Sequence, residues 1–179
     1  PLRALCRNPA LAMKPRVLFI SGREVDYIRN QVLVYALEEN FEVTVGTPNA
    51  GNIIIRILIG VMKFLLGRPK YDVCFVGFYG QLLAIVLSFL QNKPIVLDAY
   101  VSTYETLCED RQVFRAASPA GLLAKWLDSY SCRVATRIIT DTLTDAQYFH
   151  KTYDVPAHKI TPIYVGCDPT IFQPRAVCD

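Results

Sequence analysis

A carboxylate closes one of the apolar segments of this chain. Residues 94–97 read Pro-Ile-Val-Leu, Asp98 follows them, and a polar stretch covers residues 99–105. An apolar run of this length is typical of a strand buried on both faces, and open α/β sheets bind ligands at the carboxyl ends of such strands. Asp98 is therefore a candidate to contact a ligand. The alternative role is structural, because an aspartate after a strand often caps a turn.

Glycines and cations follow the other apolar segments. Gly22 and Arg23 come directly after residues 16–21, where glycine lets a ligand approach the backbone and a helix N-terminus offers N–H groups to an anion. Arg29 and Arg111 can add to a clamp for a phosphate or a carboxylate. We expect the strand ends to line one cleft. The residues at these ends are Gly22, Arg23, Gly46, Thr47, Gly77, Tyr79, Gly80, Asp98, Tyr100, Asp141, Thr142, Gly166 and Asp168.

Several common cofactor and catalytic sites are excluded by motif. Residues 21–25 read Ser-Gly-Arg-Glu-Val, without the G-x-G-x-x-G pattern of NAD and FAD sites. The chain has no Walker A sequence and no G-x-S-x-G turn, which argues against a P-loop NTPase and an α/β hydrolase. His150 and His158 come late in the chain and favour surface positions over a triad or a metal site. We expect no cofactor and no metal.

Length and composition fit one globular domain. The chain has 179 residues, 52% of them hydrophobic, and this is enough to bury a core. A net charge of +3 without an RNA- or DNA-binding signature argues against a nucleic-acid partner. None of the six cysteines shows C-x-x-C spacing, so we expect free thiols in a reducing cytosol. We expect residues 1–14 to form a flexible arm, residues 15–174 the domain, and residues 175–179 the start of a linker.

Apolar strands and amphipathic helices alternate along the chain. This order predicts right-handed βαβ units, and hence an α/β fold with a Rossmann-like open parallel sheet and helices on both faces. In the first helix, the spacing predicts that Val25, Ile28, Val32 and Ala36 face the core. The expected strands are residues 16–21, 41–46, 71–77, 94–98, 137–141 and 160–165, and the expected helices are residues 24–40, 53–66, 81–90, 118–135 and 142–153.

Two helices carry N-terminal signals. Ser118 is followed by Pro119, which suits a cap and the first helical position. Thr142 and Asp145 have the spacing of a capping box. This pattern favours a structural role for Asp141 and Thr142 over a catalytic one.

The helix expected over residues 53–66 is apolar at nearly every position. Arg56, Gly60, Lys63 and Gly67 share one face, because spacings of three and four residues stay on one side of a helix. The segment is too short to span a bilayer. Burial against the sheet and contact of residues 53–70 with a membrane surface both stay open, the second as an added role. The cations expected near anionic headgroups are Arg56, Lys63, Arg68 and Lys70.

The ends of the expected strands resemble the N-terminal domain of GT-B glycosyltransferases of family 4. Residues 94–100 are similar to the P-x-V-x-D-x-H strand of that family. The patterns Ser102-x-Tyr104-x-Thr106, Asp110-Arg111 and Leu127-Asp128-x-x-Ser131-Cys132-Arg133-x-Ala135 are similar to a bacterial subgroup. The resemblance covers about residues 15–174. Its remaining matched positions are Thr140, Asp141, Thr142, Ala146, Tyr148, Phe149, Val155, Pro156, Lys159, Ile160, Val165, Gly166, Asp168, Phe172 and Pro174.

The resemblance implies the acceptor-binding half of a retaining enzyme that moves a sugar from a nucleotide sugar to an acceptor hydroxyl. It implies that Gly22 and Arg23 contact the donor diphosphate, and that Asp98 and Tyr100 lie at the reacting centre. The acceptor would be a glycan or a lipid-linked sugar, handled in the cytoplasm or at the inner face of the cell membrane. A second domain, C-terminal to this one, would bind most of the nucleotide sugar. The residues implied to contact the acceptor are Tyr79, Ser102, Tyr104, Asp110 and Arg111.

One position departs from the family pattern, and rival interpretations remain. Tyr100 stands where the family has histidine, so the role of that histidine does not carry over. Asp110 and Arg111 are equally consistent with a solvated ion pair. The main rival function is a non-catalytic Rossmann-like module that binds a sugar or a nucleotide. A response regulator or a flavodoxin would require an acidic cluster or a flavin loop after the first strand, and residues 21–23 are not acidic.

Overall fold

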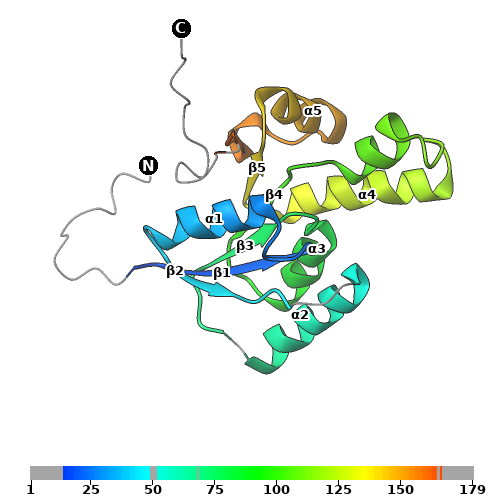
Figure 1. Cartoon of the computed structure of the whole chain (residues 1–179). Coiled ribbons are helices and arrows are strands. Elements are labelled where there is room, and N and C mark those ends of the chain that lie inside the picture. Colours follow the sequence, from blue (N-terminus) through cyan, green and yellow to red (C-terminus); the bar gives the residue numbers. More distant parts are fainter. Residues whose placement is uncertain (1–13, 49–51, 68, 165, 167–179) are drawn as a thin grey trace, which may run out of the picture.

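The computed structural model describes residues 14–48, 52–67, 69–164 and 166, which form an α/β fold (Figure 1). Six parallel strands make one sheet in the order β2-β1-β3-β4-β5-β6, and helices flank it. The predicted fold class is therefore confirmed. Asp168 and Arg68 lie outside the described residues. The strands are β1 (Arg16–Ser21), β2 (Glu42–Val45), β3 (Val73–Gly77), β4 (Ile95–Asp98), β5 (Arg137–Thr140) and β6 (Ile160–Pro162), and the α-helices are α1 (Ile28–Glu38), α2 (Ile53–Gly67), α3 (Gln81–Leu90), α4 (Pro119–Val134) and α5 (Leu143–Tyr153).

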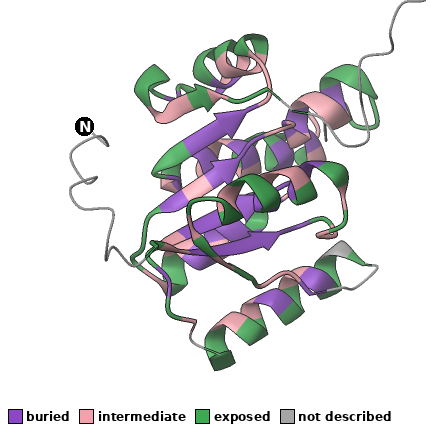
Figure 2. Cartoon of the chain, turned by 60° about the vertical axis from the view of Figure 1, so that its left-hand side comes forward, coloured by how far each residue is buried: buried purple, intermediate pink, exposed green. Residues whose placement is uncertain are grey.

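Two cores lie on the two faces of the sheet. Along β1, Leu18 and Ile20 belong to one core and Val17 and Phe19 to the other, because successive side chains of a strand point to opposite faces. The first core packs against α2, α3, α4 and α5, and the second packs against α1. Figure 2 shows the strands as the most buried layer between these helices.

The direction of the chain across the sheet changes at β1. From β1 the chain passes through α1 to β2, and from β2 it returns through α2 to β3 on the other side of β1. The connections that leave β1 and β3 therefore lie on opposite faces of the sheet. In open α/β sheets this switch point is where the loops part and ligands bind.

Both predicted helix caps are confirmed. The Ser118 hydroxyl accepts a hydrogen bond from the Gly121 N–H at 3.1 Å, and Pro119 is the first residue of α4. At the start of α5, the Thr142 hydroxyl accepts from the Asp145 N–H at 3.0 Å, and the Asp145 carboxylate accepts from the Thr142 N–H at 3.1 Å. These caps fix where α4 and α5 leave the carboxyl edge of the sheet.

The buried face of α1 differs from the prediction. The expected core-facing residues were Val25, Ile28, Val32 and Ala36. Instead α1 begins at Ile28, which is 59% exposed, and it buries Arg29, Asn30 and Val34. The prediction was wrong because two of these side chains are polar and find their partners outside the helix. Arg29 pairs with Asp98. The Asn30 side-chain oxygen accepts from the Phe78 N–H at 3.3 Å, and its amide donates to the Glu24 carbonyl at 2.8 Å.

Helix α2 turns the first half of its polar stripe toward the sheet, whereas Lys63 and Gly67 are exposed. Arg56 and Gly60 are buried, and a side chain at Gly60 would begin 3.3 Å from the Ile20 methyl, so glycine lets the helix lie close to β1. The position of Arg56 contradicts the expectation that it lies near lipid headgroups. The expected burial of α2 against the sheet is confirmed for one side of the helix only, and the other side is exposed (Figure 2). The exposed large apolar residues of α2 are Ile54, Ile55, Leu58, Ile59, Met62, Leu65 and Leu66.

The stretch between β4 and α4 is more ordered than its sequence indicated. Residues Glu105–Asp110 form a π-helical segment, which follows a loop that begins at Tyr100. Segments of this kind occur often at functional sites. Residues 100–118 show no repeat of apolar residues that would indicate a helix, so the prediction was an irregular loop.

The cysteines and histidines behave largely as expected. Cys74, Cys108 and Cys132 are free and buried, and Cys74 lies within β3. Burial raises the pKa of the Cys74 and Cys132 thiols to about 12, so both stay protonated and unreactive at neutral pH. His150 and His158 are exposed, and His150 Nδ1 lies 2.7 Å from the Val155 carbonyl oxygen.

Candidate functional site

The loops after β1 and β3 pack directly on each other at the switch point. The N–H groups of Gly22 and Arg23 both donate to the Phe78 carbonyl, at 3.0 and 3.1 Å. A Cβ atom on Gly22 would lie 2.0 Å from the Tyr79 carbonyl oxygen, so glycine is required for this contact. Tyr79 itself has a φ of 55°, which is unusual for a side chain of its size. Gly22 therefore joins two loops, whereas the sequence indicated that it admits a ligand.

A buried arginine from α2 holds the same loop from below. Arg56 Nη1 donates to the Gly22 carbonyl at 2.7 Å, and its Nη2 donates to the Glu24 carboxylate. The pKa of Glu24 lies below its ordinary value, mainly because the Glu24 carboxylate accepts a hydrogen bond from the Glu24 backbone N–H. Burial opposes this shift, and Arg56 adds to it. Arg23 contacts the same carboxylate from the surface, at 3.3 Å, and its side chain is 44% exposed. The Arg23 guanidinium is thus a fixed cation that solvent can reach.

Four aromatic side chains meet at this point, and we call them the switch-point aromatic cluster: Tyr27, Phe78, Tyr79 and Tyr100. The Phe78 ring centre lies 4.9 Å from that of Tyr27, 4.4 Å from that of Tyr79 and 5.1 Å from that of Tyr100. Phe78 is buried and the three tyrosines are half-buried. The Arg23 guanidinium carbon lies 5.4 Å from the Tyr27 ring centre. The cluster therefore links the loops after β1, β3 and β4.

Asp98 forms a buried ion pair with α1. Arg29 Nε donates to the two carboxylate oxygens at 3.1 and 2.8 Å, and Nη2 donates to Oδ1 at 2.6 Å. Arg29 Nη1 also reaches Asp141 Oδ1 at 3.4 Å. The two side chains of the main pair are 4% and 0% exposed. The Arg29 guanidinium carbon lies 4.3 Å from the Tyr100 ring centre. Asp98 therefore holds Arg29 in place, and Arg29 in turn holds the Tyr100 ring.

The charges of this group follow from its partners. Burial lowers the pKa of Arg29, but the hydrogen bonds and the charge of Asp98 outweigh burial and raise that pKa above its ordinary value. Arg29 is therefore a cation at neutral pH. Burial raises the pKa of Asp98, although the hydrogen bonds and the charge of Arg29 oppose that shift. Burial, and then the charge of Asp141, raise the pKa of Tyr100. Its phenol accordingly stays neutral and can donate a hydrogen bond.

A second buried group fixes the loop after β4. The Ser102 hydroxyl donates to Asp128 Oδ2 at 2.9 Å and lies 2.7 Å from the Tyr153 hydroxyl. The Tyr104 N–H donates to the same carboxylate oxygen at 2.8 Å. Ser102 and Asp128 are fully buried. Ser102, expected at the acceptor, therefore ties the loop to α4 and α5.

The far end of this loop is more accessible than its start. Tyr104 is still buried, at 9% exposed, and Lys125 Nζ lies 5.4 Å from its ring centre. Asp110 and Arg111 are exposed at the end of the π-helical segment, and within the described part of the chain neither side chain forms a hydrogen bond or an ion pair. Burial, and then the charge of Asp110, raise the pKa of Glu105 to about 6. The acceptor residues predicted in this loop thus fall into two groups. Ser102 and Tyr104 are buried and anchor the loop, and Asp110 and Arg111 are exposed at its end.

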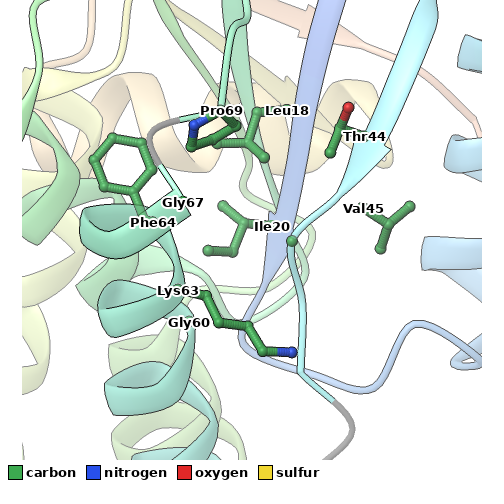
Figure 3. Close-up of a pocket in the computed structure, with 10 residues that line it drawn as sticks. Leu18, Ile20, Thr44, Val45, Gly60, Lys63, Phe64, Gly67 and Pro69 are labelled. Carbon is green, nitrogen blue, oxygen red and sulfur yellow. The ribbon is translucent and has the colours of Figure 1, made fainter.

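A cavity of about 180 Å³ lies away from the switch point, between α2 and the edge of the sheet (Figure 3). Phe64 lines it from α2, while Leu18 and Ile20 come from β1. Lys63 reaches across its lower end in the view of Figure 3. The cavity exists because Gly60 and Gly67 put no side chain into this space.

Sequence reasoning placed Asp98 and Tyr100 at the carboxyl end of a strand, where the structure has them, but it missed what surrounds them. Arg29 was considered as an anion clamp, and its partner proved to be Asp98. Asp128 had one available signal, since it is the single carboxylate of α4. No local pattern marked Phe78 as the centre of an aromatic cluster. For the residues that the structure describes, no group of three or more histidine, cysteine, aspartate or glutamate side chains is placed to hold a metal ion.

The fold and the strand ends define a Rossmann-like α/β protein with a polar and aromatic site at the switch point of its sheet. No protein-family model matches the chain, and no curated protein matches it. None of the described helices is long and apolar enough to cross a membrane.

Proposed function

We propose that this chain is the acceptor-binding domain of a retaining glycosyltransferase of the GT-B type. The reaction moves a sugar from a nucleotide sugar to an acceptor hydroxyl. One observation carries the proposal: the switch-point aromatic cluster lies beside the buried Arg29–Asp98 pair. Partly exposed rings next to a few fixed polar groups are the usual lining of a small-molecule site, and the C–H face of a sugar packs well on such rings. The resemblance of residues 94–100 to the strand of that family supports the same function.

On the acceptor side, Tyr100 is the residue that contacts the sugar. Its neutral phenol donates a hydrogen bond, and Arg29 holds its ring from behind. Asp98 is a positioning residue, because its carboxylate oxygens already accept from Arg29. Tyr79 offers a second half-buried ring at the same place.

On the donor side, Arg23 provides a positive charge for the diphosphate. A second, C-terminal domain binds most of the nucleotide sugar, and the Arg23 side chain meets the diphosphate across the cleft. Fixed cations and N–H groups stabilise the charge that develops on a leaving diphosphate. Gly22 contributes by holding the loop in place rather than by contact.

The loop after β4 selects the acceptor. Ser102 and Asp128 anchor it, while Asp110 and Arg111 extend from its exposed end. Specificity commonly resides in loops that a rigid scaffold positions. The acceptor class is a glycan or a lipid-linked sugar.

The test combines ligand binding with turnover. Saturation-transfer NMR on this chain with a panel of simple glycosides is expected to show contact that Tyr100→Ala weakens at least about tenfold, the loss of one well-placed aromatic contact and hydrogen bond. Tyr35→Ala is the matched control, because Tyr35 is 71% exposed on α1 and lies outside the cluster. The complete gene product is expected to release nucleoside diphosphate from a nucleotide sugar when acceptor is added. Binding that Tyr100→Ala leaves unchanged would contradict the proposed site.

A non-catalytic sugar- or nucleotide-binding module is the second candidate. The observation that favours it is that the Asp98 carboxylate, the group expected at the reacting centre, already accepts hydrogen bonds from Arg29 through both oxygens. Glycoside binding by the complete gene product, without sugar transfer from any common nucleotide sugar, would select the module over the enzyme.

A further inference from the structure

Three neighbouring helices present a broad apolar surface. Helix α3 contacts both α2 and α4, and all three pack on the same core. We define the α2–α4 face as the exposed apolar side chains of these helices. Its members are Ile54, Ile55, Leu58, Ile59, Met62, Leu65, Leu66, Leu82, Phe89, Leu90, Leu122, Leu123 and Trp126. Exposed apolar patches of this extent mark interaction surfaces.

The packing of α2 shows that this exposure is built into the fold. The helix packs Ile57, Val61 and Phe64 on the core, beside the buried Arg56. It leaves Leu58 60% and Leu66 79% exposed. A helix that only covered the sheet would place these leucines inward. The contacts of Arg56 with Gly22 and Glu24 fix the rotation of the helix about its axis.

Aromatic side chains continue the surface from α3 to α4. The Tyr130 ring centre lies 5.3 Å from that of Trp126 and 6.4 Å from that of Phe89, and both pairs are stacked. Phe89 is 73% exposed and Trp126 is 51% exposed. Exposed tryptophan, tyrosine and phenylalanine side chains are typical of the boundary between lipid headgroups and acyl chains.

The charges on the same helices have one sign. Lys63, Lys125 and Arg133 are exposed. Helices α2 and α3 contain no acidic residue, and the one carboxylate of α4, Asp128, is fully buried. The face therefore offers apolar side chains bordered by cations, with no exposed carboxylate to repel an anion.

We propose that the α2–α4 face docks on the surface of a bilayer that contains anionic lipids. The aliphatic side chains of α2 enter the headgroup boundary, Trp126 and Phe89 lie at that boundary, and Lys63 and Lys125 contact lipid phosphates. Arg56 in the first turn of α2 contacts Gly22, and α3 begins at Gln81, directly after the loop that carries Phe78 and Tyr79. The face therefore reaches the same edge of the sheet as the switch-point aromatic cluster. Membrane docking is independent of sugar transfer, and it can be tested without any turnover.

The native tryptophan makes the test direct, since Trp126 is the single tryptophan of the chain. The probes are vesicles of phosphatidylcholine alone and vesicles with an equal amount of phosphatidylglycerol. We expect co-sedimentation with the anionic vesicles, a blue shift of Trp126 emission, and quenching by lipids brominated near the headgroup. High salt is expected to weaken binding, because surface charges attract anionic lipid only within a Debye length.

Two variants with a matched control locate the contact. Leu58→Glu combined with Leu66→Glu is expected to weaken binding at least about tenfold, since it replaces inserted leucines with anions. Ile28→Glu combined with Tyr35→Glu introduces the same two charges on α1, across the sheet, at residues that are 59% and 71% exposed, and is expected to leave binding unchanged. Lys63→Glu is expected to weaken binding several-fold, and it serves as the second variant if the double substitution fails to fold.

Three outcomes would overturn the proposal. The first is Trp126 emission that anionic vesicles neither shift nor allow brominated lipids to quench. The second is vesicle binding that the α2 variants do not reduce. The third is a dimer in solution that buries Trp126 and does not bind vesicles. The last outcome would assign the face to a second copy of the chain.

Discussion

Removal of the Asp98 carboxylate is expected to destabilise the fold, and its magnitude follows from the geometry. The Arg29–Asp98 pair is 4% and 0% exposed, and loss of one partner from a buried pair costs about 3–5 kcal/mol. Asp141 remains 3.4 Å from Arg29, and the Tyr100 ring offers a cation–π contact worth roughly 0.5–2 kcal/mol. We therefore expect Asp98→Ala to lower the free energy of unfolding by about 2–4 kcal/mol. A direct catalytic role alone would leave stability unchanged.

Urea denaturation followed by Trp126 fluorescence measures this loss. The matched control is Asp72→Ala, which removes the exposed pair with Arg16 and is expected to have little effect. The double variant Arg29→Met with Asp98→Leu is expected to recover most of the stability, because apolar side chains often replace a buried pair without loss. A destabilisation below about 1 kcal/mol for Asp98→Ala, or a double-mutant cycle without coupling, would refute the reasoning.

Two further predictions concern the loops around the site. Gly22→Ala places a methyl group 2.0 Å from the Tyr79 carbonyl oxygen and is expected to lower the free energy of unfolding by about 3 kcal/mol or more, measured by thermal or urea unfolding. The control is Gly67→Ala, which has open space around it and is expected to be neutral or slightly stabilising. Equal effects of the two substitutions would show that the loops after β1 and β3 do not touch. The folded-state pKa of Glu105, about 6, exceeds its ordinary value of 4.5, so folding favours the protonated acid and stability falls as the pH rises from about 4.5 through 6. Glu105→Gln is therefore expected to raise stability at pH 7, by at most about 2 kcal/mol, and to change nothing near pH 4. A difference between variant and parent that does not vary with pH would count against the raised pKa.

The alternation of strands and helices was predictable because it depends on local patterns. The six strands, the Ser118 cap and the Thr142–Asp145 capping box are all confirmed within a few residues. Each depends on neighbours a few positions apart, so hydrophobic period and capping chemistry suffice. The open parallel sheet then follows from the order of the elements.

The interior of the site was less predictable because its contacts are long-range. Arg29 and Asp98 are separated by 69 positions, and Ser102 and Asp128 by 26. A polar residue at a helical position reads as exposed unless its partner is known, and for that reason the buried face of α1 was predicted wrongly. The role of Gly22 was missed for a related reason, since the Tyr79 carbonyl that excludes a side chain comes from the loop after another strand.

The contacts of Arg56 couple the position of α2 to the loop after β1. Its guanidinium spans from α2 to the Gly22 carbonyl and the Glu24 carboxylate, so the helix cannot slide or roll without breaking charged contacts in a buried place. Load applied to the outer side of α2 is therefore transmitted to the segment that carries Arg23. By thermodynamic reciprocity, an anion that stiffens this segment would in turn change how readily α2 yields.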